Sequence, residues 1–162
     1  AASGANLSCL GSWNEVTYAV NAGNLERTAR VNGVSTTMPS VVGVVNIQAQ
    51  YGVSASANSN QVTQWVEPSG ATWGSGVLTV ANRNRIKAIR IAVVARNAKL
   101  EPGIVTLAAP TAWASTATFD GNLWPAPTIN LAPGDPDWAR YRYRVFETIV
   151  PLRNVIWSKD TL

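Results

Sequence analysis

The segment 85–97, with the sequence RIKAIRIAVVARN, most constrains the fold of this chain, because it concentrates β-branched residues in one short run. Read with a period of two, Ile89, Ile91 and Val93 share one face of a strand, whereas Ala92 and Val94 share the other. The spacing also fits a helix, but the β-branching favours a strand. A strand that is apolar on both faces is typical of the centre of a sheet. The sequence therefore predicts a central strand with another layer packed on each face.

Other segments alternate between apolar and polar residues and predict further strands, at 13–20, 25–31, 44–51, 61–66 and 141–150. Turn residues at 21–24 join the first two into a hairpin, and Asn32-Gly33 marks the next reversal. The small polar segment 52–60 predicts an exposed loop, and the proline-rich segment 102–136 predicts long irregular excursions. Because strands and helices do not alternate along the chain, the sheet is expected to be mostly antiparallel.

The composition bounds the class of protein. The chain has 162 residues, which predicts a single globular domain over 1–162. Charged residues make up only 14% of the chain, which favours an extracytoplasmic protein or an assembly subunit over a cytosolic enzyme. The formal net charge is +4, but the basic residues are scattered, so we expect no specific nucleic-acid partner.

Neither catalysis nor metal binding has clear support in the sequence. The chain has no histidine, the usual general base and metal ligand, and lacks Gly-x-Ser-x-Gly, Ser-x-x-Lys and phosphate-binding loop motifs. Cys9 is the single cysteine; it is either a buried small side chain or half of a disulfide to a cysteine outside this sequence. Asp135 and Asp137, with Asp120, suggest a calcium loop, but turn formation explains them better. We therefore expect no enzyme activity, metal or cofactor.

The proline-rich segment carries Trp113 and Trp124, and Trp138 follows directly after it. Exposed indole rings there would suit stacking on sugars, which makes a secreted β-rich carbohydrate-binding module an alternative function. Buried Trp side chains that anchor the loops to a core explain the same residues.

The last predicted strand is strongly basic. Arg142, Arg144 and Arg153 form either a docking surface for a partner or the solvated face of a strand. Glu147 interrupts the apolar side of this strand. Because an unpaired buried carboxylate is costly, Glu147 is expected to pair with a buried arginine such as Arg90.

Three blocks in order carry a resemblance to a known family, namely 41–53 (VVGVVNIQAQYGV), 85–96 (RIKAIRIAVVAR) and 141–154 (YRYRVFETIVPLRN). Together they resemble the PilW family of type IV pilus minor pilins, which is similar to the J-type pseudopilins of type II secretion. The resemblance implies an α+β pilin-like fold, in which a long N-terminal helix packs on an antiparallel sheet. The leader, processing site and helix are not found in this sequence, so they are expected in a longer precursor. Contact with the membrane is expected only through that helix.

The resemblance also implies a function. It predicts a structural minor pilin that takes part in priming pilus assembly at the tip, with other minor pilins, the major pilin and possible tip adhesins as partners. The protein would lie at the periplasmic face of the inner membrane before assembly and in the extracellular pilus afterwards. Five residues are predicted at the partner interface: Arg142, Arg144, Arg153, Trp124 and Trp138.

Overall fold

The computed structural model describes residues 12, 14–113, 129–131 and 135–153. Strands in this part of the chain are β1 (Asn14–Asn21), β2 (Asn24–Val31), β3 (Val34–Val42), β4 (Val44–Ser54), β5 (Val62–Val66), β6 (Ile86–Arg96) and β7 (Tyr143–Pro151). The helices are short: α1 (Gly70–Trp73), α2 (Val80–Arg85) and the 3-10 turn η1 (Trp138–Arg140).

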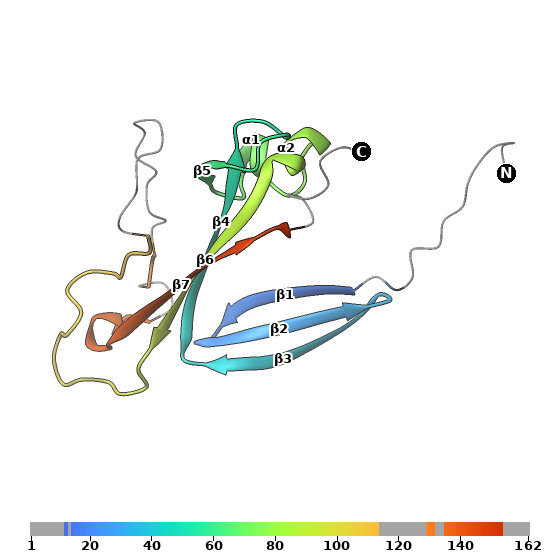
Figure 1. Cartoon of the computed structure of the whole chain (residues 1–162). Helices are drawn as coiled ribbons and strands as arrows, with labels where there is room; N and C mark the ends of the chain where they lie inside the picture. The colour runs from blue at the N-terminus through green and yellow to red at the C-terminus, as the bar shows by residue number, and fades with distance from the viewer. Residues whose placement is uncertain (1–11, 13, 114–128, 132–134, 154–162) are drawn as a thin grey trace, which may run out of the picture.

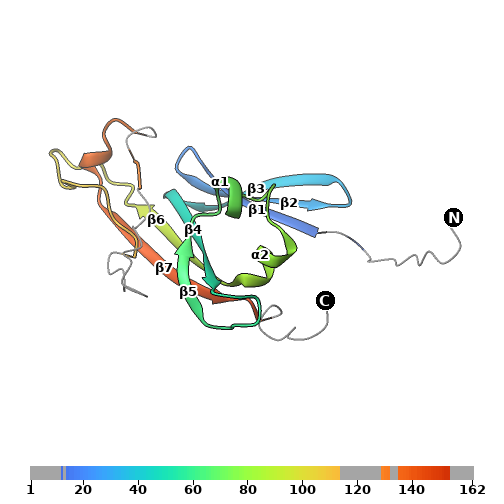
Figure 2. The ribbon, with the colours of Figure 1, turned by 90° about the horizontal axis from the view of Figure 1, so that it is seen from above.

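The strands form two antiparallel sheets, with the orders β1-β2-β3 and β5-β4-β6-β7. Figure 1 shows the three-stranded sheet extending away from one end of the twisted four-stranded sheet, and in Figure 2 it projects to one side. The predicted β-rich, mostly antiparallel fold is confirmed, and none of the described helices is long. The prediction of one domain over 1–162 stays a prediction.

The three-stranded sheet is a meander with two tight turns. Ala22 and Gly23 both have positive φ (48° and 75°), as do Asn32 and Gly33 (50° and 86°), which is the backbone of the two-residue turns that match strand twist. The hairpin expected from 13–31 is confirmed. Strand β3 was not predicted from the sequence, because its serines, threonines and proline weaken the alternation. Pro39 is tolerated because β3 is an edge strand.

The four-stranded sheet is centred on β6, as the sequence predicted, with β4 and β7 paired antiparallel on its two sides. The expected loop at 52–60 is wrong at its start, because β4 continues to Ser54 and buries Gly52, Val53 and Ser54. Small residues such as Gly52 give little periodic signal in a sequence, yet the packing of the sheet requires a small residue at this position. A Cβ on Gly52 would lie 2.8 Å from the ring of Trp65.

The core lies on one face of the four-stranded sheet. Ala92 and Val94 of β6 are fully buried there against Trp113, Ile129 and Leu131, which come from the proline-rich segment. The described part of that segment is irregular, as expected. Its chain packs on the sheet as a covering layer.

Gly43 joins the two sheets. Its φ is +85°, and it lies between β3 and β4. Its N–H donates to the Gly23 carbonyl (2.9 Å), and its carbonyl accepts from the N–H of Arg96 (2.7 Å). The turn between β1 and β2 is thereby attached to the end of β6.

Candidate partner-binding surfaces

The second face of the four-stranded sheet is apolar and incompletely covered. Register places Ile47, Ala49 and Tyr51 of β4 beside Val93, Ile91 and Ile89 of β6. Phe146 and Val150 of β7 extend the row and are 52% and 44% exposed. We call these eight residues the open sheet face.

The expectation of a layer on each face of β6 therefore holds for one face within the described residues. Ala92 and Val94 are fully buried on the covered face. Ile89, Ile91 and Val93 on the open sheet face are half-buried. A contiguous row of apolar side chains that stay partly exposed is typical of a site for a partner or another segment.

A cation is buried on the covered face. Arg90 is 6% exposed, and its guanidinium lies 4.8 Å from the ring centre of Trp65 and 4.3 Å from that of Trp113. Its Nε donates to Gln50 Oε1 (2.8 Å), and the Gln50 amide donates to Glu67. Burial lowers the pKa of Arg90 to about 10, against an opposing effect of Glu67, so Arg90 stays charged at neutral pH. The hydrogen bonds from its Nε and Nη2 and its two ring contacts are all made within the protein, which makes this a structural cluster.

The predicted ion pair between Glu147 and Arg90 is wrong. Glu147 is exposed, so the burial cost that motivated the pair does not arise. Its Oε1 accepts the backbone N–H of Trp113 at 2.7 Å, and no ion pair joins it to Arg90 in the described part of the chain. Its negative charge still raises the pKa of Arg90, after the larger effects of desolvation and Glu67.

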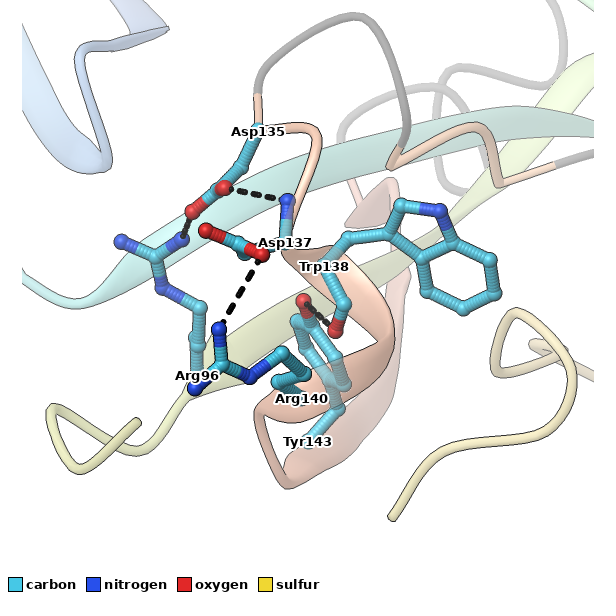
Figure 3. A network of polar contacts seen from close by, with 6 residues as sticks. All are labelled: Arg96, Asp135, Asp137, Trp138, Arg140 and Tyr143. Carbon is cyan, nitrogen blue, oxygen red and sulfur yellow. Dashed lines mark hydrogen bonds and ion pairs between the residues drawn. The ribbon is translucent and has the colours of Figure 1, made fainter. Parts of the chain in front are cut away.

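The aspartates at the end of the proline-rich segment, Asp135 and Asp137, bind arginines and shape a turn (Figure 3). Asp135 forms an ion pair with Arg96 and accepts the N–H of Asp137 at 2.9 Å, while Asp137 pairs with Arg140 at 3.4 Å. Among the described residues no group of three or more acidic, His or Cys side chains gathers as a metal site. Asp120 lies outside the described residues. The turn-forming interpretation fits Asp135 and Asp137.

The predicted interface residues do not form one cluster. Arg142 donates to Glu101 Oε1 at 3.2 Å, and this hydrogen bond is the main cause that lowers the pKa of Glu101. Arg144 is exposed and lies 5.4 Å from the ring centre of Phe146. Arg153 is exposed beyond the other end of β7. Arg144 and Arg153 are thus accessible, but at opposite ends of one strand.

Of the three Trp residues considered as sugar-stacking candidates, the two that the structure describes contribute to the core. Trp113 is 8% exposed, and Trp138 is partly buried against the same cluster, with its carbonyl accepting the Tyr143 hydroxyl at 2.8 Å (Figure 3). Trp124 lies outside the described residues. The rings of Trp113 and Trp138 act as loop anchors, and this placement does not favour sugar stacking.

A cavity of about 660 Å³ lies where the two sheets meet. Val20 and Gly23 of the first hairpin, Ile47 of β4, and Arg96 and Tyr143 of the neighbouring strands are among its lining residues. The charges of Arg96 and Asp135, which both line the cavity, neutralise each other in an ion pair. Burial, as the largest cause, raises the pKa of Tyr143.

A second apolar surface, which was not predicted from the sequence, lies on the three-stranded sheet. Adjacent partners in the register share a face, and one face collects nearly all the apolar residues. We call it the β1–β3 apolar face: Val16, Tyr18, Val20, Leu25, Ala29, Val31, Val34, Met38 and Val41. The alternation of 16, 18 and 20 was visible in the sequence, but its exposure depends on how the sheets pack.

Two sheets with incompletely covered apolar faces, and no metal-binding cluster in the described part of the chain, are typical of a protein that works through binding partners. The family model described as type IV pilus-assembly protein W, PilW, matches residues 15–154, and the chain therefore belongs to the PilW family. It takes part in type IV pilus assembly, as a structural or assembly protein associated with the envelope or pilus and its components.

The other comparisons add no relative. No curated protein and no solved structure matches the chain. The relation to J-type pseudopilins stays a prediction. In the part of the chain that the structure describes, no helix has the length and apolar character needed to cross a bilayer.

Proposed function

We propose that this chain is the globular part of a minor pilin, which primes type IV pilus assembly at the fibre tip together with other minor pilins. One observation carries the proposal: the open sheet face is apolar along the central strand of a protein from a pilus-assembly family. A pilin helix is the element that this face would receive. The chain 1–162 would act as one domain beneath that helix.

The dimensions of the open sheet face suit a helix. β6 has 11 residues, which corresponds to a strand about 36 Å long and to about 24 residues of α-helix lying along it. Burial of a branched apolar side chain contributes roughly 1.5–3 kcal/mol when it is complete. The half-buried Ile89, Ile91 and Val93 would gain part of that contribution from the helix.

In this proposal the subunit functions through lateral association with other minor pilins and with the major pilin, and it can present a tip adhesin. Its association would begin at the periplasmic face of the inner membrane and persist in the extracellular fibre. Arg142, Arg144 and Arg153 are the exposed members, among the described residues, of the interface expected from the sequence. Exposed strand edges, such as that of β7, give further main-chain groups for pairing.

An in-frame deletion of the gene tests the proposal. A priming subunit sets the number of fibres, so the deletion should reduce the number of pili per cell at least about tenfold, with an unchanged length distribution and unchanged major pilin in the membrane. Complementation with the intact gene is the control. An unchanged number of fibres, or fewer fibres because the major pilin is lost, would contradict priming.

Immunogold labelling tests the tip position. An epitope inserted at Gly103, where a Cβ would meet nothing within 4 Å, should be labelled at one end of each fibre. Label distributed along the fibre would place the subunit in the shaft and overturn the tip assignment.

A further inference from the structure

The three-stranded sheet is amphipathic, and its apolar face lies exposed. On the β1–β3 apolar face, Tyr18 is 51% exposed, Met38 52% and Val34 70%. The opposite face is polar, and on it the hydroxyls of Thr28 and Thr37 form a cross-strand hydrogen bond of 2.7 Å. A sheet whose apolar residues gather on one exposed face is expected to bind a partner on that face.

One cation lies at the centre of this apolar face. Register places Arg27 on the middle strand β2, between Tyr18 of β1 and Met38 of β3. Within the described residues Arg27 makes no hydrogen bond, ion pair or ring contact. A partner that covers the face desolvates this guanidinium, which is costly unless the partner supplies an anion.

A second copy of the chain does not suit this face. Two-fold pairing of the sheets would bring the two central Arg27 side chains together, and like charges at an interface cost several kcal/mol. Three strands of eight or nine residues make a narrow face, with about 10 Å between the axes of the outer strands. The central charge and the narrow face therefore favour a different partner that has additional contacts elsewhere.

The dimensions suit a single helix. The two outer strands lie about 10 Å apart, which is close to the diameter of an α-helix with its side chains. A strand of eight residues is about 27 Å long and matches about 18 residues of helix.

We propose that the β1–β3 apolar face binds one amphipathic α-helix of a neighbouring pilus subunit, with an Asp or Glu in the apolar stripe of that helix paired to Arg27. The inference rests on the proposed function and names the surface and the partner chemistry through which it operates. The carboxylate opposite Arg27 fixes the register of the helix on the sheet and discriminates against apolar helices without an acidic residue.

Photo-crosslinking in piliated cells identifies the occupant. The complete protein carries Tyr18→p-benzoylphenylalanine in one strain and Thr17→p-benzoylphenylalanine in a matched control, because Thr17 is the neighbouring residue on the polar face. After irradiation, mass spectrometry of the adduct identifies the linked peptide. We expect position 18 to link to a helical segment of another subunit with an acidic residue in its apolar stripe, at least about tenfold more than position 17.

Any other product overturns the inference. A link to a second copy, to a segment of the same chain, or to a strand or loop of another subunit would identify a different occupant. No adduct, or equal adducts at positions 17 and 18, would show that the face is unoccupied.

Charge reversal tests the ion pair. Arg27→Glu should reduce the crosslink from position 18 at least about tenfold, whereas Arg30→Glu, on the polar face of the same strand, should change it less than twofold. Replacing the acidic residue of the linked helix by arginine should restore the crosslink to Arg27→Glu. Equal effects of the two variants, or no restoration, would contradict the pair. If deletion of the gene reduces piliation while these tests fail, the inference fails and the proposed function stands.

Discussion

At the scale of single residues, Arg90 and Glu101 contribute to stability in different ways. Arg90 is buried between two indole rings, and its environment fixes its geometry. Glu101 is held by Arg142 and Lys99, at 3.2 and 3.5 Å, at the surface. The first group contributes through packing, and the second through a charge that depends on pH.

Replacing Arg90 by lysine should destabilise the fold. An ammonium cannot stack as a plane between Trp65 and Trp113 or reproduce the guanidinium hydrogen bonds to Gln50. We expect the free energy of unfolding to fall by about 1–3 kcal/mol, measured by urea denaturation. Arg144→Lys is the matched exposed control and should change it by less than about 0.5 kcal/mol. Equal effects of the two variants would refute the packing role.

Glu101 should make stability depend on acid pH. Its pKa in the folded protein is lowered, first by the hydrogen bond from Arg142, so its contribution is present above the unfolded value of 4.5 and is lost as the pH falls through the folded value. Glu101→Gln should flatten the fall in thermal stability below pH 4.5. Arg142→Gln should act similarly, and the double variant should add little. A full wild-type slope in Glu101→Gln would contradict the assignment.

At the scale of elements, sequence reasoning succeeded where the alternation was long and failed where packing decided. β6 and β4 were predictable, because Ile89, Ile91 and Val93 alternate with residues of the covered face. β3 was missed, since both of its faces are exposed and few of its residues require burial. The position of Glu147 was also missed, because exposure depends on which loop reaches β7 and no local pattern encodes that contact.

Adding a side chain at the glycine that joins the sheets should destabilise the fold. At Gly43 a Cβ would lie 3.1 Å from the Arg96 carbonyl oxygen, and φ is +85°. Gly33 has φ +86° with nothing within 4 Å, so Gly33→Ala isolates the cost of the backbone conformation. We expect Gly33→Ala to lose about 1 kcal/mol and Gly43→Ala to lose about 1 kcal/mol more, measured by thermal unfolding. A smaller loss at Gly43 than at Gly33 would show that the contact with Arg96 relaxes.

At the scale of the whole molecule, each of the two sheets has one apolar face that is incompletely covered. The open sheet face and the β1–β3 apolar face belong to different sheets, and Val20 and Ile47 from these two faces line the same cavity. The sequence indicated that a layer belonged on β6. It did not indicate that the loops at 112–113 and 129–131 cover one face and leave the other open, because that choice depends on long-range packing.

A charge on the open sheet face should separate folding from assembly. Ile91 is half-buried at the centre of that face. In the chain 1–162, Ile91→Glu should lower the melting temperature by only a few degrees, since the carboxylate can still reach water. In piliated cells it should reduce the number of pili at least about tenfold, because the helix proposed to cover this face would desolvate the carboxylate. Normal piliation with Ile91→Glu would exclude a helix over Ile91.

Gly43 also determines how the molecule responds to tension. Its carbonyl accepts from the N–H of Arg96 at the end of the central strand, and its N–H donates to the Gly23 carbonyl. Tension on the three-stranded sheet therefore reaches the four-stranded one along the chain through Gly43 and its two hydrogen bonds, beside the packing of β1 and β2 against β4. The covalent path from the edge strand β3 into β4 is one residue long, so a pull on either sheet is felt directly by the other.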